Sequence, residues 1–279
     1  MSPRQDQQKP VGQFLLQPRF EVIPMKGVEE EAGFLPAGAI VPVTVSPRKG
    51  LDATFVLSEH LAARGFRVIP HLSARLVRNR EHLRDILDRL AAGGFEEIFL
   101  IGGDASEPVG PYQSAGALMA DMMEMDKRPK RIGVAAYPDG HPLIGREELF
   151  RALQEKQPNA DYMITQICFD KAKIAKWLAS MRERGIHLPV YIGIPGMLKR
   201  SKLLEISLKV GVGDSTRFLM HQFGLIARLL QKDMYTPDAL VAKTITLLEA
   251  PGNGIAGFHI YTFNQCQTTE LWRQRVLKL

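Results

Sequence analysis

Short runs of apolar residues alternate along the chain with longer segments that have the apolar spacing of amphipathic helices. The short runs predict β-strands, because a strand that is covered on both faces reads as a continuous apolar stretch. Eight strands are predicted, at residues 20–24, 40–45, 68–72, 97–101, 132–137, 162–169, 190–194 and 257–263.

The segments between these strands carry helix signals. Apolar residues at 83–90 recur at i, i+3, i+4 and i+7, after Asn79 as a helix N-cap. Residues 174–181 repeat the pattern after Asp170. The helix at residues 27–34 is predicted to be very short, and the segment at residues 197–255 is long enough for two or three helices.

Strands that alternate with single helices predict a parallel sheet, and eight such units favour a closed barrel over an open sheet. The predicted fold class is α/β, as an eight-stranded parallel β/α (TIM) barrel in a single domain. We expect the barrel to occupy residues 18–279, after a flexible N-terminal tail at residues 1–17.

Composition narrows the class of protein. The chain has 279 residues, of which 45% are hydrophobic and 24% charged, and this excludes a disordered or fibrous protein. The net charge of +6 suits anionic ligands, but the basic residues are scattered, so nucleic-acid binding is not expected. Because the chain shows neither a signal peptide nor a membrane span, we expect a cytoplasmic protein.

Two kinds of metal signal are missing from the sequence. Cys168 and Cys266 stand alone, without CxxC spacing, and predict buried thiols rather than a zinc site or a disulfide framework. The histidines show no HExxH motif, so no metal site is predicted.

Polar side chains interrupt seven of the eight predicted strands, mostly near their C-terminal ends. A buried polar group without a partner costs about 1–3 kcal/mol, and this barrel fold carries its active site at the C-terminal ends of the strands. The pattern therefore predicts an active site there. The interrupting residues are Glu21, Thr44, His71, Asp104, Tyr137, Gln166, His259, Tyr261 and Thr262.

Taken alone, each of these residues also has a structural interpretation. Glu21 would form an ion pair with an arginine, and His71 would be a satisfied core histidine. Asp104 would cap a loop or helix, and Gln166 would bond to backbone across the barrel. The functional interpretation depends on their occurring together.

The same motifs resemble those of methylenetetrahydrofolate reductases, in order, on all eight predicted strands from residue 20 to about 270. The most specific are residues 133–142, residues 159–166 followed by Phe169-Asp170, and residues 257–264. Residues 20–24 are similar to the family's opening Phe-Glu-x-x-Pro. Shorter matches are Val43-Thr44-Val45, Pro70-His71-Leu72-Ser73, Leu100-Ile101-Gly102-Gly103-Asp104 and Ile194-Pro195-Gly196.

The resemblance implies roles for three of the residues. Glu21 would be the general acid that protonates the folate nitrogen released when the methylene bridge opens, and burial in an apolar barrel would raise its pKa to suit that task. Asp104 would lie near the ring of a bound FAD and tune its electronics. Gln166 would orient the pterin and, in turn, the nicotinamide.

The resemblance also implies binding residues. FAD would lie over the C-terminal ends of the strands, against Thr44, His71, Gly102, Gly103, Asp104, Tyr112, Gln113, Ala135, Tyr137, His141 and Lys156. The substrate would contact Glu21, Gln166, Arg217 and Gln265. Gly102 and Gln265 stand where the family has arginine, and Arg217 would replace a lost basic contact.

The resemblance implies FAD-mediated, ping-pong interconversion of 5,10-methylenetetrahydrofolate and 5-methyltetrahydrofolate with NAD(P)H, in either physiological direction. The partners would be tetrahydrofolate, NAD(P)H and further copies of the chain in a homo-oligomer. Two alternatives stay open. One is a divergent flavin- or pterin-binding barrel with another substrate, or one that transfers hydride without flavin, as Gly102 suggests; the other is a non-catalytic folate binder, against which Glu21 argues.

Overall fold

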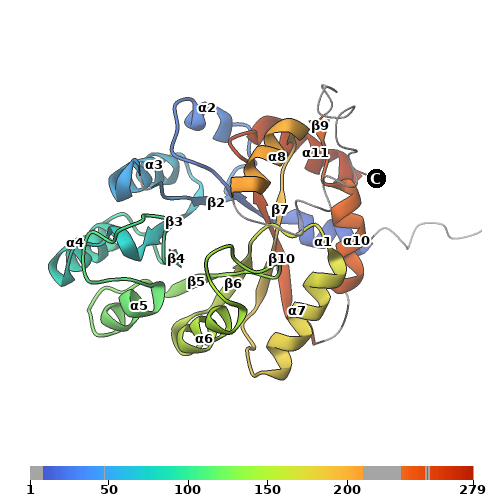
Figure 1. Cartoon of the computed structure of the whole chain (residues 1–279). Helices are drawn as coiled ribbons and strands as arrows, with labels where there is room; N and C mark the ends of the chain where they lie inside the picture. Colours follow the sequence, from blue (N-terminus) through green and yellow to red (C-terminus); the bar gives the residue numbers. More distant parts are fainter. Residues whose placement is uncertain (1–8, 47, 210–233, 249, 251, 279) are drawn as a thin grey trace, which may run out of the picture.

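A computed structural model describes residues 9–46, 48–209, 234–248, 250 and 252–278 of the chain. Eight parallel strands close into a barrel in the order β1-β10-β7-β6-β5-β4-β3-β2, which confirms the predicted α/β barrel (Figure 1). The strands are β1 (Arg19–Glu21), β2 (Ile40–Val43), β3 (Arg67–Ser73), β4 (Glu97–Ile101), β5 (Arg131–Ala136), β6 (Tyr162–Thr165), β7 (Val190–Pro195) and β10 (Ile255–Tyr261).

Helices lie around the barrel, and their apolar residues belong to the core that covers the outer side of the strands (Figure 1). They are α2 (Val28–Ala32), α3 (Gly50–Ala63), α4 (Arg80–Ala92), α5 (Ala115–Met123), α6 (Arg146–Lys156), α7 (Lys171–Glu183), α8 (Arg200–Lys209), α10 (Asp238–Leu248) and α11 (Cys266–Lys278). A small antiparallel pair, β8 (Leu198–Lys199) with β9 (Met234–Tyr235), lies outside the barrel.

The capping residues behave as their sequence positions predict. The Asn79 side chain accepts a hydrogen bond from the His82 amide at the start of α4, and Asp170 accepts from Ala172 at the start of α7. The helix after the first strand, α2, has five residues, as short as expected. The predicted sixth strand is too long, because the chain leaves the barrel after Thr165 and turns toward the Asp170 cap.

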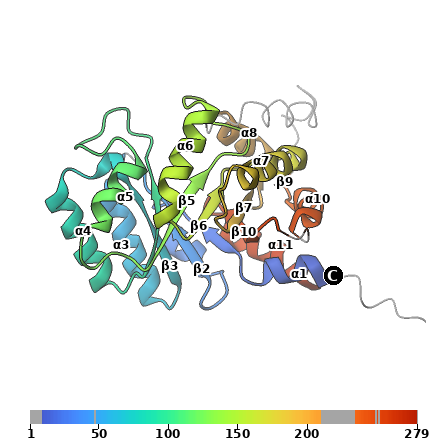
Figure 2. The same cartoon turned by 90° about the horizontal axis from the view of Figure 1, so that it is seen from below.

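The N-terminal segment differs from the prediction. Residues Lys9–Leu16 form helix α1, which lies beside α11 (Figure 2). Arg273 of α11 donates hydrogen bonds to the carbonyls of Leu15 and Leu16, and a buried ion pair with Glu270 holds its guanidinium in place. Residues 9–16, which the sequence assigns to a flexible tail, thus form a helix whose C-terminal carbonyls these contacts satisfy.

The interior of the barrel has its own small core, separate from the one under the helices. Its centre is Ile69, Phe99, Tyr162 and Ile164, from three strands. Below it, at the N-terminal ends of the strands, the Arg19 guanidinium lies 4.2 Å from the ring centre of Tyr162 and 4.1 Å from that of Tyr191. This packed interior leaves the C-terminal ends of the strands as the end at which polar side chains gather.

Candidate active site

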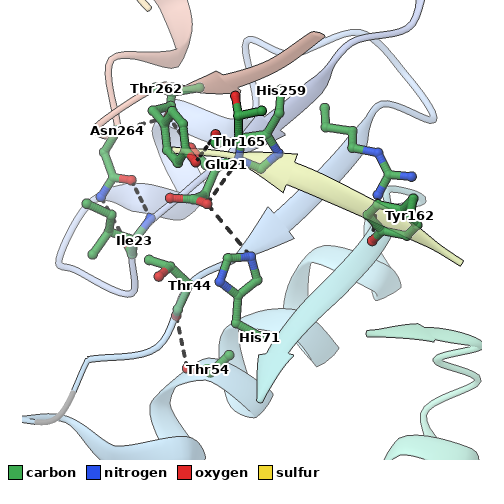
Figure 3. A network of polar contacts seen from close by, with 12 residues as sticks. Glu21, Ile23, Thr44, Thr54, His71, Tyr162, Thr165, His259, Thr262 and Asn264 are labelled. Carbon is green, nitrogen blue, oxygen red and sulfur yellow. Dashed lines mark hydrogen bonds and ion pairs between the residues drawn. The ribbon is translucent and has the colours of Figure 1, made fainter. Parts of the chain in front are cut away.

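Three polar side chains from separate strands meet inside the barrel near its C-terminal end (Figure 3). Glu21 is the last residue of β1, and its Oε2 lies 3.0 Å from Nε2 of His259 on β10. Nε2 of His71, on β3, lies 3.7 Å from the same oxygen. That second distance is too long for a hydrogen bond, and among the described residues His71 Nε2 has no hydrogen-bond partner.

Burial controls the protonation of these groups. It raises the pKa of Glu21 to about 7, against a smaller opposing effect of His71, and only 14% of the Glu21 side chain is exposed. Burial also lowers the pKa of His71 to about 4 and that of His259 to about 3. Both histidines are therefore neutral near pH 7, where Glu21 is close to half protonated.

Among the described residues no arginine forms an ion pair with Glu21, and the buried arginine of the same strand pairs with another carboxylate. Arg19 Nη1 lies 2.7 Å from Glu97 Oε1, at the opposite end of the barrel interior. The two neutral histidines beside Glu21 position its carboxyl group but add no positive charge that would keep it ionised. The carboxyl can therefore both donate and accept a proton.

Aromatic and hydroxyl groups of β10 and the following turn surround Glu21. The ring of Tyr261 lies 4.7 Å from that of His259, and its hydroxyl donates to the Thr165 carbonyl at 3.0 Å. Burial, and then the nearby charge of Glu21, raises the pKa of Tyr261. Gln166, directly after β6, is half-buried, and its side-chain oxygen accepts from the Ile167 amide, so this bond is local rather than across the barrel.

A second group of predicted residues gathers after β4 and β5. The rings of Tyr137 and His141 lie edge to face, 5.2 Å apart. Burial raises the pKa of Tyr137 to about 12, and the charge of the exposed Asp104 adds to this effect. Burial lowers the pKa of His141, and the charge of Asp104 opposes this effect.

A hollow of about 390 Å³ adjoins this group between α6 and α7. Its lining includes three of the predicted residues, Ala135, Tyr137 and Lys156. Basic and aromatic side chains, Arg146 and Trp177 among them, complete the lining. Burial lowers the pKa of Lys156 to about 8, so an anionic group in the hollow would favour its charged form.

The two glycines after β4 have different surroundings. Gly103 has φ of 98°, and a Cβ added there would come within 1.9 Å of Ser73 Oγ, so only glycine fits. A Cβ added at Gly102 would meet nothing within 4 Å. The position at which the family has arginine is therefore open space in this chain.

Other predicted residues lie apart from these groups or have their polar atoms engaged. Tyr112 is buried, and its hydroxyl donates to Asp121 at 2.7 Å. Gln113 and Gln265 are exposed, and Thr44, half-buried at the end of β2, accepts a hydrogen bond from Thr54 through its carbonyl. Arg217 lies outside the described residues.

His259 is absent from the predicted catalytic and binding residues, although its polar side chain interrupts the last predicted strand. The two-residue spacing of His259 and Tyr261 places both on the interior face, and this was the available signal. The sequence could not show that Glu21 is their neighbour. Strands β1 and β10, which pair Arg19 with His259 and Glu21 with Tyr261, meet only when the barrel closes.

Comparisons with known proteins agree with these motifs. The family model described as "Methylenetetrahydrofolate reductase" matches residues 41–274, which leaves Glu21 outside the match. Methylenetetrahydrofolate reductase 2 of Saccharomyces cerevisiae is 26% identical over 141 residues, covering 44% of this chain and 24% of that protein. Methylenetetrahydrofolate reductase 1 of Schizosaccharomyces pombe is 25% identical over 136 residues, covering 48% of this chain and 22% of that protein.

The match thus spans about a quarter of the length of these relatives. Among solved structures, a chitinase from Rhizomucor miehei superposes with a TM-score of 0.51 at 9% identity, covering 93% of this chain and 100% of that one. At this identity the likeness supports the barrel fold alone.

Proposed function

The chain belongs to the methylenetetrahydrofolate reductase family, and we propose that it interconverts 5,10-methylenetetrahydrofolate and 5-methyltetrahydrofolate. In the reducing direction, NAD(P)H supplies a hydride and the medium a proton, and NAD(P)+ leaves. The observation that carries the proposal is Glu21, a buried carboxyl at the mouth of the barrel whose pKa is raised to about 7.

Glu21 suits the proton transfer that this reaction needs. When the methylene bridge opens, the departing folate nitrogen takes up a proton, and a carboxyl with a pKa near the working pH is an effective donor. Protonated Glu21 supplies that proton, and in the reverse direction the ionised carboxylate removes it. His259, at 3.0 Å, orients the carboxyl in both states.

The residues around the hollow and after β4 and β5 fit a bound flavin. When bound, FAD would accept a hydride from NAD(P)H and deliver it to the folate. Lys156 and Arg146, in the hollow between α6 and α7, would hold its phosphates, because both are basic. Asp104, Tyr137 and His141 would lie against its ring system. Because Gly103 has no side chain, the backbone there would approach the flavin closely.

Half-reaction kinetics test the proposal. The purified protein should carry a flavin absorbance that NAD(P)H bleaches, and methylenetetrahydrofolate should restore it. Glu21→Gln should bleach at the wild-type rate and fail to recover with folate. Recovery of the mutant at the wild-type rate would show that Glu21 is not the acid, and a wild type that never reacts with folate would refute the proposed substrate.

Direct hydride transfer without flavin is the second candidate. Gly102 leaves open space where the family has arginine, and the Tyr112 hydroxyl is engaged by Asp121. A colourless protein that reduces methylenetetrahydrofolate with NAD(P)H would favour this candidate over the first.

Location and assembly are predictions of the same proposal. In the part of the chain that the structure describes, no helix has the length and apolar character needed to cross a membrane. We propose a cytoplasmic homo-oligomer, to be tested by cell fractionation and by analytical ultracentrifugation.

A further inference from the structure

The turn after β10 holds the end of β1 through side chains as well as through the backbone (Figure 3). Backbone pairing between the strands ends at Glu21 and Tyr261. Beyond it, the Thr262 amide donates to the Glu21 carbonyl at 3.2 Å, and the Thr262 hydroxyl donates to the same carbonyl at 2.6 Å. Asn264 accepts from the Ile23 amide at 2.8 Å and donates to the Ile23 carbonyl at 2.9 Å, so its side-chain amide takes the place of a peptide group.

The backbone of the turn is unusual in a way that serves this contact. Phe263 has φ of 49° and Asn264 has φ of 59°, two successive left-handed residues of which neither is glycine. Asparagine tolerates this region, whereas phenylalanine rarely adopts it, and such residues persist where the surroundings impose them. The conformation turns the Asn264 side chain back toward β1.

The side chain of Asn264 serves β1 rather than the helix that follows. α11 begins at Cys266, so its N-cap position is Gln265, and Asn264 lies one residue before that position. Both hydrogen bonds of the Asn264 amide group instead go to Ile23. The turn is thus directed at the strand that carries the general acid.

We propose that Asn264 is a positioning residue for Glu21, acting with Thr262. The two residues fix the backbone from the Glu21 carbonyl to Ile23, directly after the Glu21 side chain, while His259 holds its carboxyl. Both the backbone and the carboxyl group of Glu21 are therefore held in position before the substrate binds. We call these contacts of Thr262 and Asn264 with Glu21 and Ile23 the clamp. This inference rests on the proposed function, because it assigns the clamp a part in the proton transfer.

Asn264→Gly is the sharpest test, because glycine relieves the left-handed strain while it removes both hydrogen bonds. We expect the folate half-reaction to slow roughly 100-fold, the effect of an acid displaced by about 1 Å. Flavin reduction by NAD(P)H should stay within about twofold, since Asn264 acts only through Glu21. Thr262→Val should slow the folate step in the same selective way, and Thr262→Ser, which keeps the hydroxyl, should restore it.

Asn253→Ala is the matched control, at the other end of the same strand. Asn253 precedes β10 and donates to the Leu247 carbonyl at 3.0 Å, so its loss removes a comparable bond away from Glu21. The control should leave both half-reactions unchanged. Equal loss of both half-reactions in Asn264→Gly, or a folate step as fast as in the wild type, would overturn the inference.

Two readouts need no turnover and separate this inference from the proposed function. The Ile23 amide should exchange with solvent about tenfold faster in Asn264→Gly than in the wild type. The carboxyl titration of Glu21, followed by infrared difference against Glu21→Gln, should shift. If the wild type proves inactive with folate, the proposed function fails, and an unchanged titration in Asn264→Gly would separately overturn the positioning role.

Discussion

The two ends of the barrel interior both bury polar side chains, but they satisfy them differently. At the N-terminal ends of the strands, which we call the closed end, Arg19 forms an ion pair with Glu97 at 2.7 Å and a hydrogen bond with the Tyr162 hydroxyl at 2.9 Å. Burial opposes the charge of Arg19, yet its neighbours outweigh burial and raise its pKa. Two residues along the same strand, Glu21 faces neutral histidines, and its pKa rises because burial outweighs the smaller opposing effect of His71.

The difference shows how one strand serves two purposes. A buried ion whose charge is matched is fixed in one protonation state and contributes to structure. A buried carboxyl whose charge is unmatched gains or loses a proton near neutral pH, which is the property that catalysis uses. Substitutions at the two ends should therefore separate activity from stability.

The largest expected effect is that of Glu21→Gln on folate turnover. Loss of a positioned general acid slows proton transfer by about 10²–10⁴-fold. Folding should not suffer, because the substitution removes a buried carboxyl that is costly to ionise. Folate kinetics and thermal unfolding measure the two quantities, and a lower melting temperature with full activity would reverse the roles assigned to the two ends.

Glu97→Gln at the closed end should have the opposite signature. It leaves the Arg19 guanidinium buried without its counter-charge, which costs about 3–5 kcal/mol of unfolding free energy. Denaturant titration measures this loss. The folded fraction should keep its rate of folate reduction within a few-fold, and a selective loss of that rate would show that the closed end takes part in catalysis.

Sequence patterns predicted the frame of the molecule well, for local reasons. The strand positions follow from apolar runs, and the caps Asn79 and Asp170 from residue types that bond helix amides. Helix α1 was not predicted, because Arg273, which binds the carbonyls at its end, is distant in sequence. The anchoring role of this arginine appears only when the chain ends meet.

The site was predictable in part. Glu21 stood out as a carboxylate inside an apolar run, and the resemblance gave it a role. The contact with His259 was not predictable, because it joins residues 238 positions apart through barrel closure. The clamp by Asn264 was equally hidden, since nothing in the sequence marks Phe263 for a left-handed conformation.

The pH dependence of folate reduction sharpens the contrast between the ends. The proposed function requires Glu21 to carry a proton, and burial raises its pKa to about 7. The rate should therefore be level below pH 7 and fall about tenfold per pH unit above it. Single-turnover oxidation of the reduced enzyme by folate, across pH 5.5–9 (roughly the range that brackets a pKa of this kind), measures the profile. Glu97→Gln should keep the wild-type midpoint, and a moved midpoint in that variant would mean that the two ends are electrostatically coupled.

The smallest expected effect is that of His71→Asn on the same profile. His71 lowers the pKa of Glu21 slightly against the rise that burial causes, so removing the imidazole should raise that pKa and move the midpoint to higher pH by a fraction of a unit. Ile69→Val, one interior position further down β3, is the control and should leave the midpoint unchanged. Measuring only the folate half-reaction keeps any effect of His71 on flavin binding out of the comparison. A midpoint that moves to lower pH would mean that His71 stabilises the protonated carboxyl of Glu21 more than the ionised carboxylate. That result would contradict the effect of His71 on the Glu21 pKa given above.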